Sequence, residues 1–138
     1  MQGDQLPRPA TRRILIVEDN ELNLKLLRDV LEVHGYATVS TTEGMAALAL
    51  ARDDPPDLIL MDLQLPDISG LDAVRMLKDD ERTRGIPIVA VTAFAMVGDE
   101  RKALDSGCDA YVTKPIVLRH FLEVVARFVG PAGGTPQS

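Results

Sequence analysis

Short apolar runs alternate along the chain with longer segments of helical periodicity. Three of the runs, ILIV, LILM and IVAV, are apolar throughout, which is typical of strands that are covered on both faces. The pattern predicts five strands, at Ile14–Val17, Thr38–Thr41, Leu58–Met61, Ile86–Val91 and Ala110–Thr113. It also predicts five helices, at Glu21–His34, Glu43–Arg52, Gly70–Asp80, Ala95–Asp105 and Leu118–Val129. We therefore expect a strand-then-helix unit that is repeated five times.

Local signals mark the ends of several predicted helices. Asp19 or Asn20 is suited to cap the first helix, since a short polar side chain can accept a hydrogen bond from its open backbone N–H groups. Gly35 is suited to end that helix. The second helix is expected to stop before Pro55 and Pro56, because proline does not continue a helix.

Strands that alternate with helices indicate a parallel sheet, because parallel neighbours need a crossover connection and a helix is the usual one. Five units are too few for an eight-stranded barrel, so we expect an open, doubly wound α/β sheet. In such sheets ligands bind beyond the carboxyl ends of the strands. The residues that follow the strands are therefore the first candidates for a functional site.

Charged or polar residues suited to chemistry follow four of the predicted strands. Glu18 and Asp19 follow the first, Asp62 the third, Thr92 the fourth and Lys114 the fifth. Carboxylates that converge on one edge repel each other, and a hard divalent cation such as Mg²⁺ relieves the repulsion. Taken singly, each acidic residue reads more simply as a solvated loop end or a helix cap. Taken together, the five residues favour a metal site.

The same edge offers groups that suit phosphoryl transfer. Lys114 supplies a positive charge, either as a salt-bridge partner of Asp62 or as a binder of an anionic oxygen on a ligand. Thr92 adds a hydroxyl, which could instead cap the next helix. A cation, a carboxylate nucleophile, an ammonium and a hydroxyl are together what phosphoryl transfer requires.

Composition excludes several other classes of function. The 138 residues carry 15 Lys and Arg against 21 Asp and Glu, a formal net charge of −6, whereas nucleic-acid binding normally needs a basic surface. The one cysteine, Cys108, excludes an internal disulfide and is expected to be a small buried apolar residue. No apolar run approaches the ~20 residues that cross a bilayer. We therefore expect a small acidic cytoplasmic domain without a nucleic-acid or membrane partner.

Glycine and proline mark both ends of the chain. Residues 1–11 (MQGDQLPRPAT) contain two Pro and one Gly, and residues 130–138 (GPAGGTPQS) contain three Gly and two Pro. Such composition favours disorder. We expect a disordered arm at 1–11, one folded domain at 12–129 and a disordered tail at 130–138, too short to fold as an effector domain.

Four sequence blocks resemble the receiver domain of two-component response regulators. The blocks are ILIVEDNELN, DLILMDLQLPDISG, IPIVAVTAFA and GCDAYVTKP. The resemblance extends from about Arg12 to Val129, and VEDNELN, MDLQLP and VTAFAM are most similar to bacterial single-domain cell-cycle regulators of the DivK type. It implies a flavodoxin-like receiver fold, with five parallel strands in the order 2-1-3-4-5 and five helices.

The resemblance assigns the strand-end residues to a phosphorylation site. It implies that Asp62 accepts a phosphoryl group. It implies also that Asp62 binds Mg²⁺, or Mn²⁺ in its place, together with Asp19, Glu18 and the backbone carbonyl of Gln64. Lys114 is implied to contact the phosphoryl group.

The resemblance also implies residues that respond to phosphorylation and residues that shape the loops around the site. Thr92 is the switch hydroxyl that moves to a phosphoryl oxygen, Tyr111 is the aromatic switch that follows it, and Ala93 is a small neighbour that leaves the site open. The residues that shape the loops are Pro66, Gly70 and Pro115, the last joined to Lys114 by an expected cis peptide bond.

The implied partners are proteins. A histidine kinase or a phosphotransfer protein would donate the phosphoryl group, a downstream target would bind the altered surface, and phosphorylation-dependent dimerisation is a further expectation. The candidate contact residues are Met96, Val97, Val117 and Val124, although scattered surface apolar residues would give the same pattern. His120 is expected to be a surface residue and not a phosphotransfer histidine.

Two other functions fit parts of the pattern. A Mg²⁺-dependent, doubly wound phosphatase-like enzyme also uses a strand-end Asp, but such enzymes usually carry a second Asp two positions later, where this chain has Gln64. A flavodoxin-like cofactor binder would need a glycine-rich phosphate loop after the first strand, where EDNELN stands. We therefore expect a signalling protein that catalyses at most its own phosphorylation and dephosphorylation.

Overall fold

Five parallel strands form the centre of the structure, in the order β2-β1-β3-β4-β5. The strands are β1 (Arg13–Val17), β2 (Ala37–Thr41), β3 (Leu58–Met61), β4 (Ile88–Thr92) and β5 (Ala110–Thr113). The computed structural model describes residues 12–93 and 96–130. The observed sheet confirms the fold class that the sequence pattern predicts and the strand order that the family resemblance implies.

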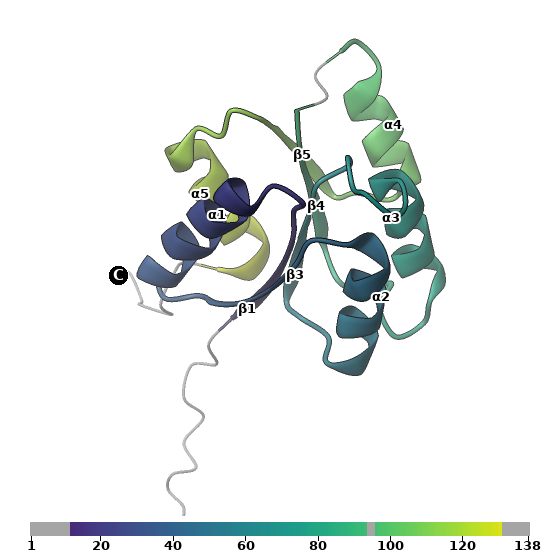
Figure 1. Ribbon diagram of the computed structural model, residues 1–138, viewed down its shortest axis with the longest axis horizontal. Helices are drawn as coiled ribbons and strands as arrows, with labels where there is room; N and C mark the ends of the chain where they lie inside the picture. Colours follow the sequence, from purple (N-terminus) through teal and green to yellow (C-terminus); the bar gives the residue numbers. More distant parts are fainter. Residues whose placement is uncertain (1–11, 94–95, 131–138) are drawn as a thin grey trace, which may run out of the picture.

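A helix follows each strand, and the helices divide between the two faces of the sheet. They are α1 (Glu21–Val33), α2 (Gly44–Asp53), α3 (Gly70–Asp79), α4 (Asp99–Ser106) and α5 (Leu118–Val129). Helices α1 and α5 cover one face, and α2, α3 and α4 cover the other (Figure 1). The sheet is therefore doubly wound, and the carboxyl ends of all five strands lie at one edge.

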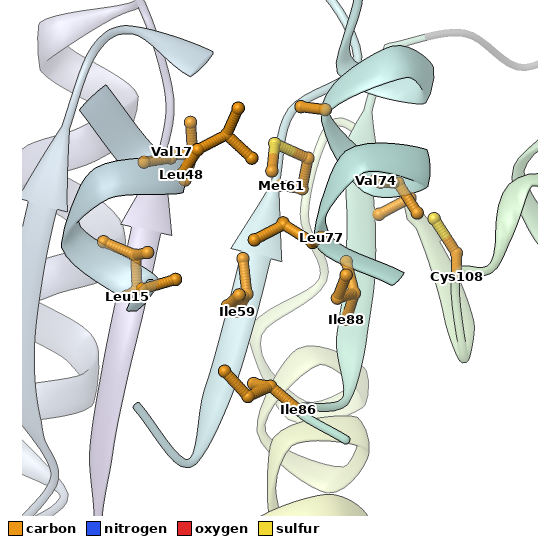
Figure 2. Close-up of a cluster of buried hydrophobic side chains, with 14 of the residues drawn as sticks. Leu15, Val17, Leu48, Ile59, Met61, Val74, Leu77, Ile86, Ile88 and Cys108 are labelled. Carbon is orange, nitrogen blue, oxygen red and sulfur yellow. The ribbon is translucent and has the colours of Figure 1, made fainter. Parts of the chain in front are cut away.

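Alternate side chains of the central strands fill two separate cores, because successive residues of a strand point to opposite faces. In β1, Leu15 and Val17 pack toward α2 and α3, whereas Ile14 and Ile16 pack toward α1 and α5. Figure 2 shows the first of these cores, in which side chains of the central strands meet those of α2 and α3. Burial on both faces explains why these strands are apolar throughout.

Two elements begin at least two residues later than the sequence predicts. Strand β4 begins at Ile88 instead of Ile86, because Pro87 has no N–H to donate to the ladder. Helix α4 begins at Asp99, because Gly98 has a φ of 94° and this left-handed conformation does not continue a right-handed helix. Residue 95, where that helix is predicted to begin, lies outside the described residues.

The first helix distinguishes between its two candidate caps. Asn20 Oδ1 accepts a hydrogen bond of 2.9 Å from the backbone N–H of Asn23, so Asn20 caps α1 and the exposed Asp19 does not. Gly35, with a φ of 93°, lies just beyond the end of this helix, as predicted. The capping role of Asn20 leaves the Asp19 carboxylate at the edge of the sheet for other interactions.

Within residues 12–93 and 96–130, no helix combines the length and the apolar character that crossing a membrane requires. The predicted arm at 1–11 and residues 131–138 of the predicted tail lie outside the described part of the chain.

Candidate phosphorylation and metal site

Three carboxylates meet at the carboxyl edge of the sheet, beyond β1 and β3. Glu18, Asp19 and Asp62 each place an oxygen atom within 4.8 Å of the others. Glu18 and Asp62 are almost fully buried, whereas Asp19 is exposed. The three residues come together because β1 and β3 are parallel neighbours, so that their carboxyl ends lie side by side.

Backbone hydrogen bonds fix these residues just beyond the strands. The N–H of Glu18 donates to the carbonyl of Thr41 at 3.1 Å, and the N–H of Asp62 donates to the carbonyl of Val17 at 2.9 Å. Each bond extends the ladder of the sheet past the end of a strand. The two buried carboxylates are therefore held directly at the ends of the central strands β1 and β3.

Lys114 enters the same site from the end of β5. Its ammonium nitrogen Nζ lies 2.8 Å from Glu18 Oε1 and 2.9 Å from Asp62 Oδ2. The backbone N–H of Lys114 donates to the carbonyl of Thr92 at 2.8 Å, and a cis peptide bond joins Lys114 to Pro115, as expected from the sequence. Lys114 thus contacts both buried carboxylates.

The pKa values of this cluster reflect burial and mutual contact. Burial is the largest influence on Glu18 and raises its pKa; contact with Lys114 opposes the shift, and the negative charge of Asp62 adds to it. For Lys114, burial lowers the pKa, but hydrogen bonds to Glu18 and Asp62 outweigh this effect and raise it. Burial thus dominates the pKa of Glu18, whereas contact with the two carboxylates dominates the pKa of Lys114.

The residues present fit a divalent cation. If all three carboxylates are ionised, the ammonium of Lys114 offsets one of the three negative charges and leaves two. A cation of charge two with oxygen ligands would neutralise the remainder. Mg²⁺ prefers such oxygen donors and keeps several of its waters, which suits a site that is open to solvent at the exposed Asp19.

The loop after Asp62 is folded tightly against the site. The N–H of Gln64 donates to Asp62 Oδ1 at 2.9 Å, and the N–H of Gly70 donates to the carbonyl of Leu63 at 3.1 Å. A β-carbon at Gly70 would lie 2.4 Å from Leu63 Cα and 2.6 Å from the carbonyl oxygen of Asp62. Glycine is therefore required at position 70, while Pro66 lies exposed at the turn of the loop.

The predicted switch residues lie on adjacent strands. Thr92, at the end of β4, is fully buried, and Ala93 after it is exposed. Ala90 pairs with Tyr111 and Thr92 pairs with Thr113, so all four side chains lie on the face of the sheet that α2, α3 and α4 cover. Thr92 and Tyr111 therefore lie on one face, two positions apart in register.

Tyr111 is half-buried and packs against the core between the sheet and α2, α3 and α4. Burial raises the pKa of its hydroxyl, and the charges of Asp99 and Glu100 raise it further. The start of α4, which carries both acidic residues, thus lies near enough to Tyr111 to influence its hydroxyl.

The sequence pattern of the response regulator receiver domain matches residues 14–126. The chain belongs to this receiver family. Over 122 residues the receiver is 54% identical to the polar-differentiation response regulator DivK of Brucella ovis, a match that covers 88% of this chain and 99% of the relative. DivK of Brucella anthropi is 53% identical over 121 residues, with coverage of 88% and 98%. The receiver is thus a DivK-type two-component signalling protein, and the phosphatase-like alternative is not favoured.

Solved structures place the receiver in the same family. One is the receiver domain of a sensor histidine kinase from Pseudomonas aeruginosa with a magnesium ion coordinated in its active-site cleft; it has a TM-score of 0.81 and 34% identity and covers 88% of this chain and 99% of its own. Another is a co-crystal structure of the Saccharomyces cerevisiae phosphotransfer protein Ypd1 with the receiver domain of the response regulator Ssk1. It has a TM-score of 0.79 and 34% identity, with coverage of 86% and 88%.

Three of the four predicted contact residues lie on the surface of the receiver. Met96, Val97 and Val117 are 78%, 105% and 66% exposed. The prediction for Val124 is wrong, because its side chain is only 3% exposed and packs in the core between the sheet and α1 and α5. Val124 follows Phe121 by three positions, so both lie on the broad apolar face of α5.

Two other predictions for the receiver concern a histidine and the cysteine. His120 is exposed on α5, as predicted. Cys108 is 6% exposed and packs in the core near Val74 (Figure 2), also as predicted. Burial raises the pKa of its thiol to about 11, so Cys108 is a core residue and not a reactive one.

One residue near the site was not singled out by the sequence. Asp67, in the loop after Asp62, accepts hydrogen bonds of 2.8 Å from the backbone N–H groups of Gly44 and Met45. This contact joins the loop to the beginning of α2. Its signal in the sequence is weak, because the two partners lie more than twenty residues before Asp67.

Proposed function

We propose that Asp62 accepts a phosphoryl group from a phosphohistidine on a histidine kinase or a phosphotransfer protein, and that the phosphorylated receiver signals through protein contacts. The observation that carries this proposal is the position of Asp62. Its carboxylate is 3% exposed, lies beside Glu18 and Asp19, and is 2.9 Å from the ammonium of Lys114. A carboxylate held in this way is both oriented and partly neutralised for attack on phosphorus.

In the proposed transfer, one oxygen of Asp62 attacks the phosphorus atom. A bond forms between that oxygen and phosphorus, and the bond between phosphorus and the histidine nitrogen breaks. The electron pair of the broken bond remains on the imidazole. Lys114 stabilises the negative charge on the phosphoryl oxygens as they approach Asp62.

We propose that Asp62, Asp19, Glu18 and the carbonyl of Gln64 hold Mg²⁺, or Mn²⁺ in its place. The bound cation would neutralise charge on the transferred group. The supporting observations are the three converging carboxylates and the magnesium ion in the similar receiver domain from Pseudomonas aeruginosa. The backbone N–H of Asn20 donates a hydrogen bond of 3.1 Å to the carboxylate of Glu18. The residue that precedes α1 therefore orients this proposed metal ligand.

The phosphodonor is proposed to approach beside Lys114. A surface hollow of about 470 Å³ lies there, lined by Asn23 and Leu26 of α1, Ala93, and the segment Lys114–Ile116. The side chain of Ala93 is small, which leaves room in this hollow for an imidazole beside Lys114. The co-crystal structure of a similar receiver domain with a phosphotransfer protein supports a donor of that class.

Phosphorylation is proposed to change the surface around α4 and β5. A phosphoryl group on Asp62 adds acceptor oxygens, which the hydroxyl of Thr92 can reach by moving toward the site. Tyr111 lies on the same face as Thr92 and is proposed to follow this movement. The exposed Met96, Val97 and Val117 would then form part of a contact surface for a downstream protein or for a second copy in a phosphorylation-dependent dimer.

The curated relatives are bacterial, and we propose that the receiver works in the bacterial cytoplasm as a component of cell-cycle signalling. Its chemistry would be limited to its own phosphorylation and dephosphorylation. A signalling role of this kind needs a changeable surface more than it needs a substrate pocket.

Incubation with Mg²⁺ and acetyl phosphate tests the proposal. Intact-mass measurement is expected to show one added phosphoryl group on the wild type and none on Asp62→Asn. Asp53→Asn, at an exposed carboxylate at the end of α2, is the control and should be labelled like the wild type. Equal labelling of Asp62→Asn and the wild type would remove Asp62 from its proposed role.

A further inference from the structure

We infer that Asp67 is a positioning residue for the phosphorylation site, because it fastens the loop between β3 and α3 to the beginning of α2. The inference rests on the proposed function, since that loop carries the Gln64 carbonyl proposed to bind the cation. Asp67 is not among the three converging carboxylates, and we do not propose that it contacts the cation or the phosphoryl group. Its effect would pass through the backbone of the loop.

The beginning of α2 depends on Asp67 for its cap. Among the described residues, the side chain of the N-cap residue Glu43 makes no capping hydrogen bond, and the first turn of α2 carries no acidic residue. The two carboxylate oxygens of Asp67 instead accept from Gly44 N–H and Met45 N–H, each at 2.8 Å. A carboxylate at a helix start satisfies open N–H groups and interacts favourably with the helix dipole.

Close packing reinforces this link between the loop and α2. A β-carbon at Gly44 would lie 2.7 Å from Ile68 Cγ1 and 3.2 Å from Leu65 Cδ1. Both of those side chains belong to the loop and lie partly buried against the core. The absence of a side chain at position 44 therefore lets the loop come close enough for Asp67 to reach the N–H groups of α2.

Two backbone N–H groups hold the loop near its two ends. The N–H of Gln64 donates to Asp62 Oδ1 at 2.9 Å, and the N–H of Gly70 donates to the carbonyl of Leu63 at 3.1 Å. Asp67 lies midway between Gln64 and Gly70 in sequence. Its hydrogen bonds to Gly44 and Met45 supply a fixed point for the middle of the loop, and thereby limit the directions that the Gln64 carbonyl can take.

The charge of Asp67 is consistent with this role. The N–H groups of Met45 and Gly44 hold the pKa of its carboxyl below the usual range, so the side chain remains a double acceptor at neutral pH. A simple helix cap would stabilise α2 alone. A positioning residue would also change the affinity of the folded protein for Mg²⁺, and this difference separates the two roles.

Titration calorimetry with MgCl₂ on the intact chain tests the inference, at a temperature where circular dichroism shows every variant folded. Loss of a residue that orients a metal ligand typically weakens metal binding 10–100-fold, and we expect Asp67→Ala to raise the Kd for Mg²⁺ about tenfold. Asp67→Asn keeps one acceptor oxygen and should fall between Asp67→Ala and the wild type. The amide NMR signal of Gln64 should shift in the same order before Mg²⁺ is added.

Asp80→Ala is the matched control. Asp80 follows the last residue of α3 and accepts a hydrogen bond of 2.8 Å from the N–H of Arg82. Its replacement by alanine removes one carboxylate charge, as Asp67→Ala does, together with a backbone hydrogen bond, but at the opposite edge of the sheet from the phosphorylation site. Its Kd for Mg²⁺ should stay close to that of the wild type. If the wild type binds no Mg²⁺, the proposed function fails; if the wild type binds and folded Asp67→Ala or Asp67→Asn binds equally well, the positioning role alone is overturned.

Discussion

The ammonium of Lys114 and the carboxylate of Asp62 are separated by 52 residues in the chain but lie 2.9 Å apart. Their side chains are 17% and 3% exposed, so each charge has little water around it. Opposite charges in such surroundings compensate each other, and the removal of one leaves the other poorly solvated. The site is therefore tied to the stability of the fold as well as to its chemistry.

Lys114→Ala is expected to destabilise the protein in a way that depends on Mg²⁺. Without the ammonium, Glu18 and Asp62 face each other without compensation, and the free energy of unfolding in EDTA should fall by about 3 kcal/mol. Mg²⁺ should restore part of the loss, because a cation at the three carboxylates supplies the missing positive charge. Urea unfolding with EDTA and with MgCl₂ measures both effects.

Lys25→Ala is the control for this measurement. Lys25 and Asp29 form a pair of 2.6 Å on the surface of α1, with exposed fractions of 64% and 49%. Solvent screens such a pair, so its loss should change the urea midpoint little and equally in EDTA and Mg²⁺. A loss in Lys114→Ala that Mg²⁺ leaves unchanged would contradict a cation beside these carboxylates.

Thr92→Ala is expected to separate phosphorylation from its structural consequence. The variant keeps all three carboxylates, so it should bind Mg²⁺ and accept a phosphoryl group from acetyl phosphate. It lacks the hydroxyl that is proposed to move toward the phosphoryl oxygen. The backbone NMR shifts that phosphorylation causes at Met96, Val97 and Tyr111 in the wild type should therefore be largely lost.

Thr113→Ala provides the comparison for Thr92→Ala. Thr113 pairs with Thr92 in the register of β4 and β5, but it is exposed. The substitution removes the same hydroxyl from the same edge of the sheet at a position that is not proposed to contact the phosphoryl group. If both variants show the wild-type shifts after phosphorylation, Thr92 is not the switch.

Most of the fold follows from local patterns in the sequence. Runs such as ILIV and LILM identify strands that are buried on both faces, and the alternation with helices requires parallel strands. The start of α4 could not be predicted in this way, because the spacing of apolar residues carries no information on the left-handed backbone of Gly98. Such a boundary depends on a single dihedral angle that glycine allows but does not require.

The site was predictable wherever the topology brings strand ends together. Glu18, Asp19 and Asp62 meet because β1 and β3 are neighbours. Lys114 reaches them from the end of β5, at the same edge of the parallel sheet, and the order of elements contains that information. The role of Asp67 was not predictable, since its partners lie at the start of α2 and the contact depends on the path of the loop that carries Asp67.

The buried face of α5 was also misjudged at one residue. Val124 lies in the same core as Phe121, because the apolar face of this helix is broad enough to include both residues, whereas the sequence-based prediction placed Val124 on the surface. The width of a buried face depends on how deeply the helix sits against the sheet, and this is set by packing across the whole core.

Cys108 is expected to resist alkylation in the folded protein. Burial raises the pKa of its thiol to about 11, so at about pH 8 only about one thiol in a thousand is ionised. Iodoacetamide should therefore modify Cys108 rapidly in urea and very slowly under native conditions, as intact mass would show. Rapid native labelling would mean that the core around Val74 opens readily.

The same thiol should make stability fall at alkaline pH. An unfolded cysteine ionises near about pH 8.5, whereas the folded thiol keeps its proton up to about pH 11. Its contribution is therefore fully present below the lower value and is lost as the pH rises through the higher one. Urea unfolding of the wild type and Cys108→Ala between these values should show a steeper decline for the wild type; parallel declines would argue against the raised pKa.

Substitution of two glycines by alanine should have opposite effects, although both remove the same conformational freedom from the unfolded chain. At Gly70 the new β-carbon would lie 2.4 Å from Leu63 Cα and 2.6 Å from the carbonyl oxygen of Asp62, and backbone atoms cannot rotate away. We expect a loss of about 3 kcal/mol and slower phosphorylation by acetyl phosphate, because the loop after Asp62 must move. At Gly85 nothing lies within 4 Å of the added carbon, so stability should rise by about 0.5 kcal/mol with the phosphorylation rate unchanged. Urea unfolding and the labelling rate measure both variants, and equal behaviour of the two would contradict the close approach of the loop to Gly70.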